Sequence, residues 1–212
     1  DGLYRKTNDP NTLPREDFPV MASSEYEASY DAPVALLKRL FEKASFAIST
    51  EETRYYLNGI YLHSVEVEGE PRLRAVATDG HRLACIDAPA PEGAGAAPNV
   101  IVPRKTVAEL RKLMEGDDGE IGVSVSATKI RFAIPELSLT SKVIDGTFPD
   151  YTRVIPQNNT RRMSVDPKEF ASAVDRVATV SAERSRAVKL SLAEDSVTFT
   201  VNSPDSGSAT DE

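Results

Sequence analysis

The sequence is poor in the residues that commonly carry catalysis and metal binding. Among its 212 residues it has one cysteine, Cys85, and two histidines, His63 and His81. A single cysteine excludes an internal disulfide and a cysteine-rich metal site, and we expect Cys85 to be a small buried apolar residue. The histidines form no HxH or HxxxH pattern, and neither a Walker-type phosphate loop nor a Gly-x-Ser-x-Gly motif is present. We therefore predict no metal and no cofactor.

Long apolar runs are also missing. No stretch approaches the roughly 20 apolar residues that cross a bilayer, and the first residues lack the apolar segment of a signal peptide. With 40% apolar and 27% charged residues, the composition is typical of a soluble globular protein. We expect a cytoplasmic protein without a membrane partner. The first residue is Asp1 rather than methionine, which we interpret as a processed end or a boundary within a longer chain.

Two amphipathic helices and several short strands are predicted. Apolar residues recur at helical spacing in Ala32–Phe46 and in Pro103–Met114. Asp31 is expected to cap the first helix, and Pro33 suits its first turn. Strand patterns cover the ranges Ser24–Tyr30, Thr53–Val67, Gly122–Ser126, Lys129–Ile134 and Leu137–Ile144. Short strands joined by tight turns between only two helices indicate an α+β fold with antiparallel sheets.

Positive charge is concentrated on the predicted helices, although the whole chain carries a net charge of −8. An acidic total argues against an ordinary nucleic-acid-binding domain, but it does not exclude a protein with one basic face. A solvated charged face is the alternative that fits most such patterns. The cations of the two helices are Lys38, Arg39, Lys43, Arg104, Lys105, Arg111 and Lys112.

The stretch from Leu73 to Ile86 is the strongest local signal. Two apolar-rich runs flank Thr78–Arg82, and the Asp79-Gly80 pair within it is a strong hairpin signal because glycine readily adopts positive φ. Asp79 and His81 could serve acid–base chemistry in a small hydrolase-type α+β enzyme. A polar turn without chemistry and an unrelated peptide-binding module are the alternatives that these residues leave open.

The chain also contains a weak internal repeat. A shift of 134 residues aligns Pro33 with Pro167 and Leu36 with Phe170, and it places a helix at Pro167–Ser181. Two further strands are expected at Ala187–Ala193 and Val197–Asn202, followed by a polar and frayed end. The repeat indicates one complete module and the beginning of a second.

Three segments together resemble a known family. Arg-Tyr-Tyr-Leu-Asn-Gly at 54–59, Ala-Thr-Asp-Gly-His-Arg-Leu-Ala at 77–84 and Asp-Gly-Thr-Phe-Pro-Asp-Tyr at 145–151 occur in this order. They are similar to segments of the bacterial DNA polymerase III β subunit, the sliding clamp. The resemblance implies modules of antiparallel sheet with two helices each. Residues 1–24 would be the tail of a first clamp domain and a linker, 25–152 a complete middle domain and 153–212 a truncated third domain.

The resemblance also implies a function, and it makes an enzyme the least favoured interpretation. Sliding clamps are processivity factors that encircle duplex DNA as a homodimeric ring, are placed there by a clamp loader, and tether DNA polymerase III and other replication or repair polymerases. The partners bind through short peptides in a groove. By this resemblance the groove residues here are Leu57, Thr78, Gly80, His81, Arg82, Leu83, Pro149, Arg153 and Val154. The residues that would face DNA are the seven helix cations named above together with Arg54, Tyr55 and Tyr56.

Overall fold

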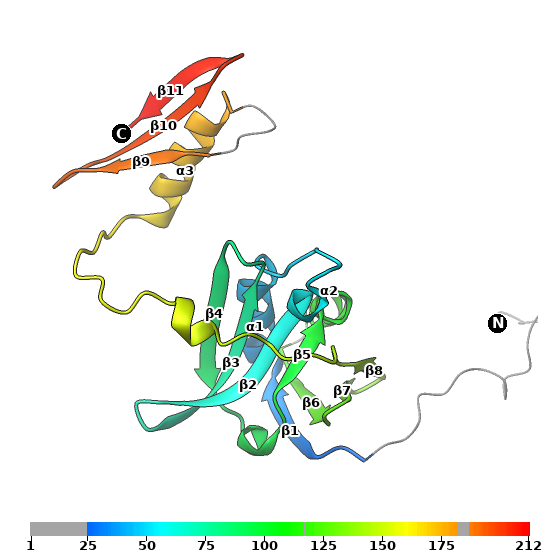
Figure 1. Ribbon diagram of the computed structural model, residues 1–212. Helices are drawn as coiled ribbons and strands as arrows, with labels where there is room; N and C mark the ends of the chain where they lie inside the picture. Colours follow the sequence, from blue (N-terminus) through cyan, green and yellow to red (C-terminus); the bar gives the residue numbers. More distant parts are fainter. Residues whose placement is uncertain (1–24, 117, 182–186) are drawn as a thin grey trace, which may run out of the picture. The chain divides into compact units, whose positions relative to one another are not determined.

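The computed structural model describes residues 25–116, 118–181 and 187–212, which belong to two compact units, Asp1–Asp150 and Tyr151–Glu212 (Figure 1). The predicted tail of a first domain, residues 1–24, lies outside the described residues. Each unit is described below by itself.

The first unit contains two four-stranded sheets, and every strand pair in them is antiparallel (Figure 1). One sheet has the order β1-β6-β7-β8 and consists of β1 (Ala28–Pro33), β6 (Glu120–Val125), β7 (Lys129–Ile134) and β8 (Leu137–Lys142). The other has the order β4-β3-β2-β5 and consists of β4 (Leu83–Pro89), β3 (Glu70–Thr78), β2 (Gly59–Val67) and β5 (Val100–Pro103). Two 3-10 turns complete the unit, η2 (Tyr55–Leu57) and η3 (Ala94–Ala96). The prediction of an α+β fold with antiparallel sheets is confirmed.

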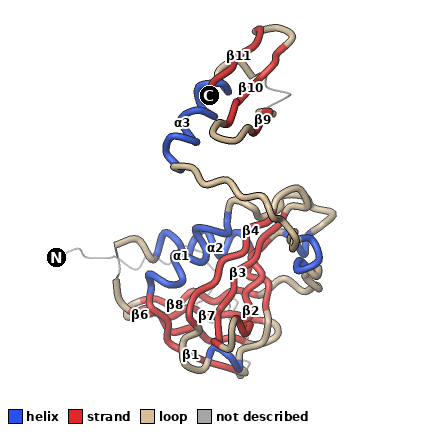
Figure 2. Tube along the Cα trace, turned by 90° about the vertical axis from the view of Figure 1, so that its left-hand side faces the viewer, coloured by secondary structure: helices blue, strands red, loops and turns tan. Residues whose placement is uncertain are grey.

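Two helices, α1 (Val34–Ser45) and α2 (Arg104–Leu113), lie next to each other against the β4-β3-β2-β5 sheet (Figure 2). Helix α1 contacts β3 and β4, α2 contacts β2 and β5, and the two helices contact each other on the same side of this sheet. Their apolar faces and both sheets share one continuous core. The fully or nearly fully buried helix residues are Val34, Leu37, Leu40, Phe41, Ala44, Val107 and Leu110. Among the described residues, no helix is long and apolar enough to span a membrane.

Helix α1 begins differently from the prediction. Asp31 does not cap α1: it lies in β1 opposite Gly122, and Pro33 is the N-cap residue without a side-chain hydrogen bond. Asp31 is extended and lies two residues before the N-cap position, too early for its carboxylate to serve as the cap. Instead, the Val34 amide donates to the carbonyl of Gly119 (2.9 Å), and the Arg104 amide at the start of α2 donates to that of Asn58 (2.9 Å). Each helix start is thus tied to a segment distant in sequence.

The second unit is smaller and contains one helix and one three-stranded sheet. Helix α3 (Pro167–Ala178) is capped by Asp166, whose carboxylate accepts from the amides of Lys168 and Glu169. The sheet has the order β11-β10-β9, formed by β9 (Lys189–Leu192), β10 (Val197–Ser203) and β11 (Gly207–Asp211). Its core is a cluster of four buried residues, Ala173, Val177, Phe199 and Val201.

The prediction of a frayed C-terminal end was wrong. Strand β11 pairs along β10 from Gly207, opposite Ser203, to Asp211, opposite Phe199. Gly207 has a φ of +85°, and the amide of Ser206 donates to the hydroxyl of Ser203 across the turn. The hairpin therefore forms from backbone pairing and turn chemistry, although few of its residues are apolar.

The two units repeat a helix followed by three antiparallel strands, and the strand order β11-β10-β9 corresponds to β4-β3-β2. The predicted shift of 134 is wrong by one residue. The inward-facing residues Leu37, Leu40, Phe41 and Ala44 of α1 correspond to Phe170, Ala173, Val174 and Val177 of α3, which are 133 residues later. The proline match misled the alignment because Pro33 precedes α1, whereas Pro167 is the first residue of α3.

The sheet face turned away from the helices carries polar and aromatic side chains. His63, Arg74 and Asp87 are paired in a row across β2, β3 and β4, and Arg74 binds Asp87 through two hydrogen bonds of 2.5 and 2.8 Å. Cys85 on this face is half-buried rather than fully buried as predicted. Partial burial raises the pKa of its thiol, which disfavours a role as a nucleophile.

Candidate functional site

The hairpin turn between β3 and β4 is fixed by its own side chains. Thr78 pairs with Leu83 at the ends of the strands, and Gly80 has a φ of +88°. The Thr78 hydroxyl accepts from the Gly80 amide (3.1 Å) and donates to the carbonyl of Arg82 (2.7 Å). The Thr78 hydroxyl therefore holds the turn, and the assignment of Thr78 to the groove stays a prediction. Beside the turn, the side chains of His81 and Arg82 are exposed.

Asp79 provides the second set of bonds within this turn. One carboxylate oxygen accepts from the amides of His81 (2.9 Å) and Arg82 (3.0 Å), and the other accepts from Nε of Arg82 (3.0 Å). The bonds from the Arg82 and His81 amides lower the pKa of Asp79 from 3.8 to about 2. A carboxylate that is so acidic and so fully engaged is a poor general base. The geometry thus disfavours the hydrolase-type interpretation based on Asp79 and His81.

The conformation of this turn should depend on pH in acid. The pKa of Asp79 is lower in the folded state than its ordinary value of 3.8. The stability that ionised Asp79 gives to the fold is therefore fully present above pH 3.8 and is lost as the pH falls toward 2. We expect the amide chemical shifts of His81 and Arg82, followed by NMR, to change with a midpoint near pH 2, and Asp79→Asn to abolish this transition. A midpoint at the ordinary value of 3.8 would contradict the hydrogen-bonding scheme.

The corner before β2 lies directly beside the turn. Arg54 binds Glu51 through two hydrogen bonds of 2.6 and 2.9 Å, and its guanidinium lies where a Cβ atom at residue 80 would be. Gly80 is favoured at this position by its positive φ, and any larger residue would also displace the end of the Arg54 side chain. Tyr55 and Tyr56 follow with their rings edge to face at 5.8 Å. Residues predicted to face DNA and residues predicted to bind a peptide are thus immediate neighbours here.

The apolar residues predicted for the groove differ in accessibility. Leu57 in η2 is only 4% exposed, so it contributes mainly to the core, whereas Leu83 is half-buried. Pro149 is exposed and follows Phe148, whose ring stacks on Tyr61 at 4.9 Å and fixes this segment to β2. Arg153 and Val154 belong to the second unit, in the 3-10 turn η4 (Tyr151–Val154), where Val154 is 67% exposed.

The sequence did not indicate Phe46 as a site residue, yet it contacts the turn. Its ring is 58% exposed, and Cζ of Arg82 lies 5.6 Å from the ring centroid. Phe46 directly follows α1 and falls on the side of the predicted helix opposite the apolar residues. An aromatic residue on the polar side of the helix pattern is the sequence signal that could have identified Phe46 as a site residue.

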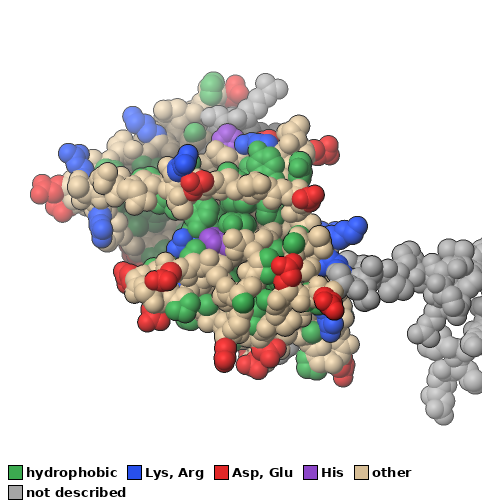
Figure 3. Space-filling model, turned by 60° about the horizontal axis from the view of Figure 1, so that its bottom comes forward, with side chains coloured by type: hydrophobic (Ala, Val, Ile, Leu, Met, Phe, Trp, Pro, Cys, Tyr) green, Lys and Arg blue, Asp and Glu red, His purple; other side chains and the backbone are tan. Residues whose placement is uncertain are grey.

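The helix cations are available to solvent over α1 and α2. All are exposed except Lys38, which is half-buried. Arg111 reaches the hydroxyl of Ser45 at the end of α1 (3.4 Å), and Arg39 reaches the carbonyl of Asp87 (3.4 Å). Lys112 is paired with Glu109 at 3.0 Å. By contrast, acidic and basic side chains are interspersed on the face shown in Figure 3.

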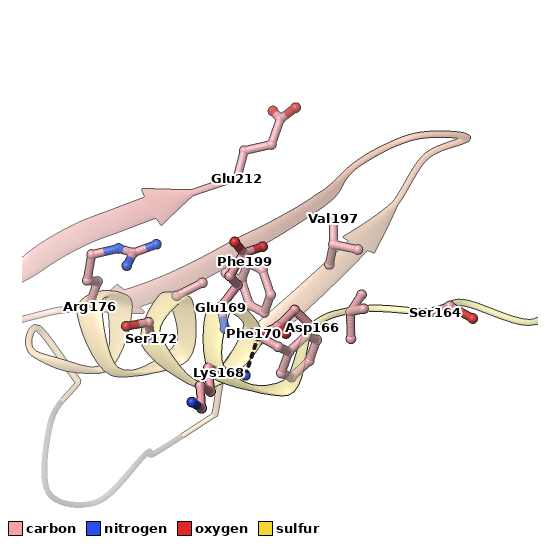
Figure 4. Close-up of a pocket in the computed structure, with 12 residues that line it drawn as sticks. Ser164, Asp166, Lys168, Glu169, Phe170, Ser172, Arg176, Val197, Phe199 and Glu212 are labelled. Carbon is pink, nitrogen blue, oxygen red and sulfur yellow. Dashed lines mark hydrogen bonds between the residues drawn. The ribbon is translucent and has the colours of Figure 1, made fainter.

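A depression of about 760 Å³ lies in the second unit between α3 and the sheet (Figure 4). Phe170 and Phe199 line it, with their rings edge to face at 5.0 Å, and Val197 lies nearby. None of the predicted groove residues lines it. Its apolar lining is continuous with the small core of the unit, so we interpret it as an uncovered edge of that core. Within the described ranges, no group of three or more His, Cys, Asp or Glu residues could hold a metal ion.

Two family models match consecutive parts of the chain. The central domain of the DNA polymerase III beta subunit matches residues 31–150, and the C-terminal domain of the same subunit matches residues 152–212. The beta sliding clamp of Caulobacter vibrioides (strain NA1000 / CB15N) is 54% identical over 200 residues, and that of Escherichia coli (strain K12) is 38% identical over 195. These alignments cover 94% and 92% of this chain but only 54% and 52% of the two relatives.

Solved structures of sliding clamps are also similar to this chain. A DnaN sliding clamp from Bartonella birtlesii bound to griselimycin has a TM-score of 0.88 at 51% identity, and a sliding clamp from Caulobacter crescentus has 0.87 at 53%. Each comparison covers 94% of this chain and 54% or 53% of the other. The chain spans about half the length of the relatives it matches. The resemblance found in the three sequence motifs is confirmed, and the chain belongs to the DNA polymerase III beta subunit family, the beta sliding clamps.

Proposed function

We propose that this chain acts, as part of a longer protein, as a processivity factor that encircles duplex DNA and tethers a polymerase. Residues 25–152 would form its middle domain, 153–212 the beginning of its third domain, and 1–24 the end of the first. The boundary between the compact units, at residues 150 and 151, and the extents of the two family models support this division.

The observation that carries the proposal is the turn at Thr78–Leu83. A binding surface for a short peptide needs apolar area and a few polar groups in fixed positions. Asp79 and Thr78 fix the backbone that carries His81, Arg82 and Leu83, and the exposed Pro149 is anchored through Phe148. With Leu57, Gly80, Arg153 and Val154, these residues form the groove that we propose. DNA polymerase III and other replication or repair polymerases would be its ligands.

The exposed cations of α1 and α2 would face DNA together with Arg54, Tyr55 and Tyr56. Contacts to phosphates carry no sequence information, so they suit a protein that slides along a duplex. In this proposal the complete protein is a cytoplasmic homodimeric ring that a clamp loader places on DNA, and it catalyses no reaction itself.

A binding experiment tests the groove. A fluorescent peptide with neighbouring apolar anchors should bind the chain, and griselimycin, to which a relative is bound, should displace it. Arg153→Ala should weaken peptide binding by about tenfold, because a charged hydrogen-bond donor is removed.

Lys112→Ala, on the helix face, is the matched control and should leave peptide binding unchanged. If Lys112→Ala weakens binding and Arg153→Ala does not, the groove has been assigned to the wrong surface.

A further inference from the structure

Phe46 occupies a fixed position although it is exposed. It directly follows α1, and its neighbours Ala44, Ala47 and Ile48 are all buried. The backbone beneath the ring is therefore held by the core, while 58% of the residue remains accessible. The accessible ring contacts Arg82, whose Cζ lies 5.6 Å from its centroid.

One edge of the Arg82 guanidinium is hydrogen-bonded to Asp79, and the edge formed by its two terminal nitrogens is accessible. Its Nε donates to Asp79 at 3.0 Å, and its Cζ lies over the Phe46 ring, 5.6 Å from the centroid. Among the described residues, no acceptor binds its two terminal nitrogens, and the side chain is 58% exposed. Two parallel N–H donors in a fixed orientation match the two oxygens of a carboxylate.

The surrounding charges leave this open edge available to an anion. Glu51 lies near the turn but is neutralised by two hydrogen bonds from Arg54. Asp79 is neutralised by Arg82 and by two backbone amides. An arriving carboxylate would therefore meet two carboxylates that are already compensated, together with guanidinium N–H groups that have no acceptor.

We propose that Phe46 and Arg82 together recognise an acidic residue of the partner peptide, next to its apolar anchors. The terminal nitrogens of Arg82 bind the carboxylate. Phe46 is a positioning residue that holds the guanidinium by a cation–π contact. This inference rests on the proposed function, and it adds the chemistry of the ligand at one end of the groove.

The test uses two labelled synthetic peptides that differ at one position. Both carry the same apolar anchors, and one has aspartate beside them where the other has asparagine. The wild-type chain should bind the acidic peptide several-fold more tightly. Phe46→Leu should weaken the acidic peptide by about two- to fivefold and leave the neutral peptide unchanged. Phe46→Tyr, which keeps the aromatic face, should retain the wild-type preference.

Arg82→Lys keeps the charge but removes the fork, and it should abolish the preference for the acidic peptide. Thermal unfolding of all variants identifies any loss of folding, and the Tyr variant separates ring chemistry from packing. Equal binding of the two peptides to the wild-type chain, or an equal loss of both with Phe46→Leu, would overturn this inference and leave the groove intact. If neither peptide binds the wild-type chain, the proposed function fails and this inference fails with it.

Discussion

Replacing Phe41 with alanine is expected to lower the free energy of unfolding of the first unit by about 3 to 5 kcal/mol. Phe41 is fully buried, and its ring meets that of Phe132 edge to face at 6.2 Å. Phe41 belongs to α1, which packs on the β4-β3-β2-β5 sheet, whereas Phe132 belongs to β7 in the other sheet. The substitution therefore leaves a cavity where the two sheets share one core.

Urea unfolding followed by far-ultraviolet circular dichroism measures this loss, since the chain contains no tryptophan. Phe46→Ala is the matched control, because it removes the same side chain just after the same helix, where the residue is 58% exposed. We expect the control to lose less than about 1 kcal/mol. Similar losses for both variants would mean that the core is not centred where the structure places it.

Removing two cations from α2 is expected to weaken binding to duplex DNA and to flatten its salt dependence. Arg104 and Lys105 are exposed at the start of the helix, and no described ion pair involves them. If both contact phosphates, the double variant Arg104→Ala/Lys105→Ala should reduce the slope of log K against log salt by about 1.8. The slope is measured by fluorescence anisotropy of a labelled duplex between about 50 and 200 mM salt.

The control for DNA binding removes the same charge elsewhere. Arg131 in β7 and Lys142 in β8 are exposed on the sheet that does not carry the two helices, so Arg131→Ala/Lys142→Ala changes the net charge equally. It should leave the slope nearly unchanged. If both double variants reduce the slope to the same extent, binding depends on net charge, and the helix face is not the DNA-binding surface.

The sequence predicted the features that depend on a regular period or on turn chemistry. The apolar spacing of α1 and α2 identified the buried faces, and the Asp79-Gly80 pair identified the β3–β4 hairpin. The missed features have two different causes. Asp31 could not cap α1 because β1 extends to Pro33 to pair with β6, which is distant in sequence. Strand β11 was missed because its composition is polar, although its pairing with β10 is local.

The same limit applies to the candidate site. The motifs identified the turn, but they could not reveal that Thr78 and Asp79 are used to build it, or that Leu57 is buried. Nor could they place Arg54 against Gly80 or Phe46 against Arg82, since 26 and 36 residues separate these pairs. Such contacts depend on tertiary packing that no local pattern encodes.

The pairing of β1 with β6 has a consequence for synthesis of the chain. Ala28 of β1 pairs with Val125 of β6, which is made much later. By contrast, β6, β7 and β8 follow one another in the chain, and each pairs with the next. At roughly 5–20 residues per second, β1 leaves the ribosome on the order of 5–20 s before its partner is available. Until then its edge is unpaired and able to associate with other strands. During synthesis, completion of this sheet thus waits for β6, so premature termination before β6 should yield an aggregating product.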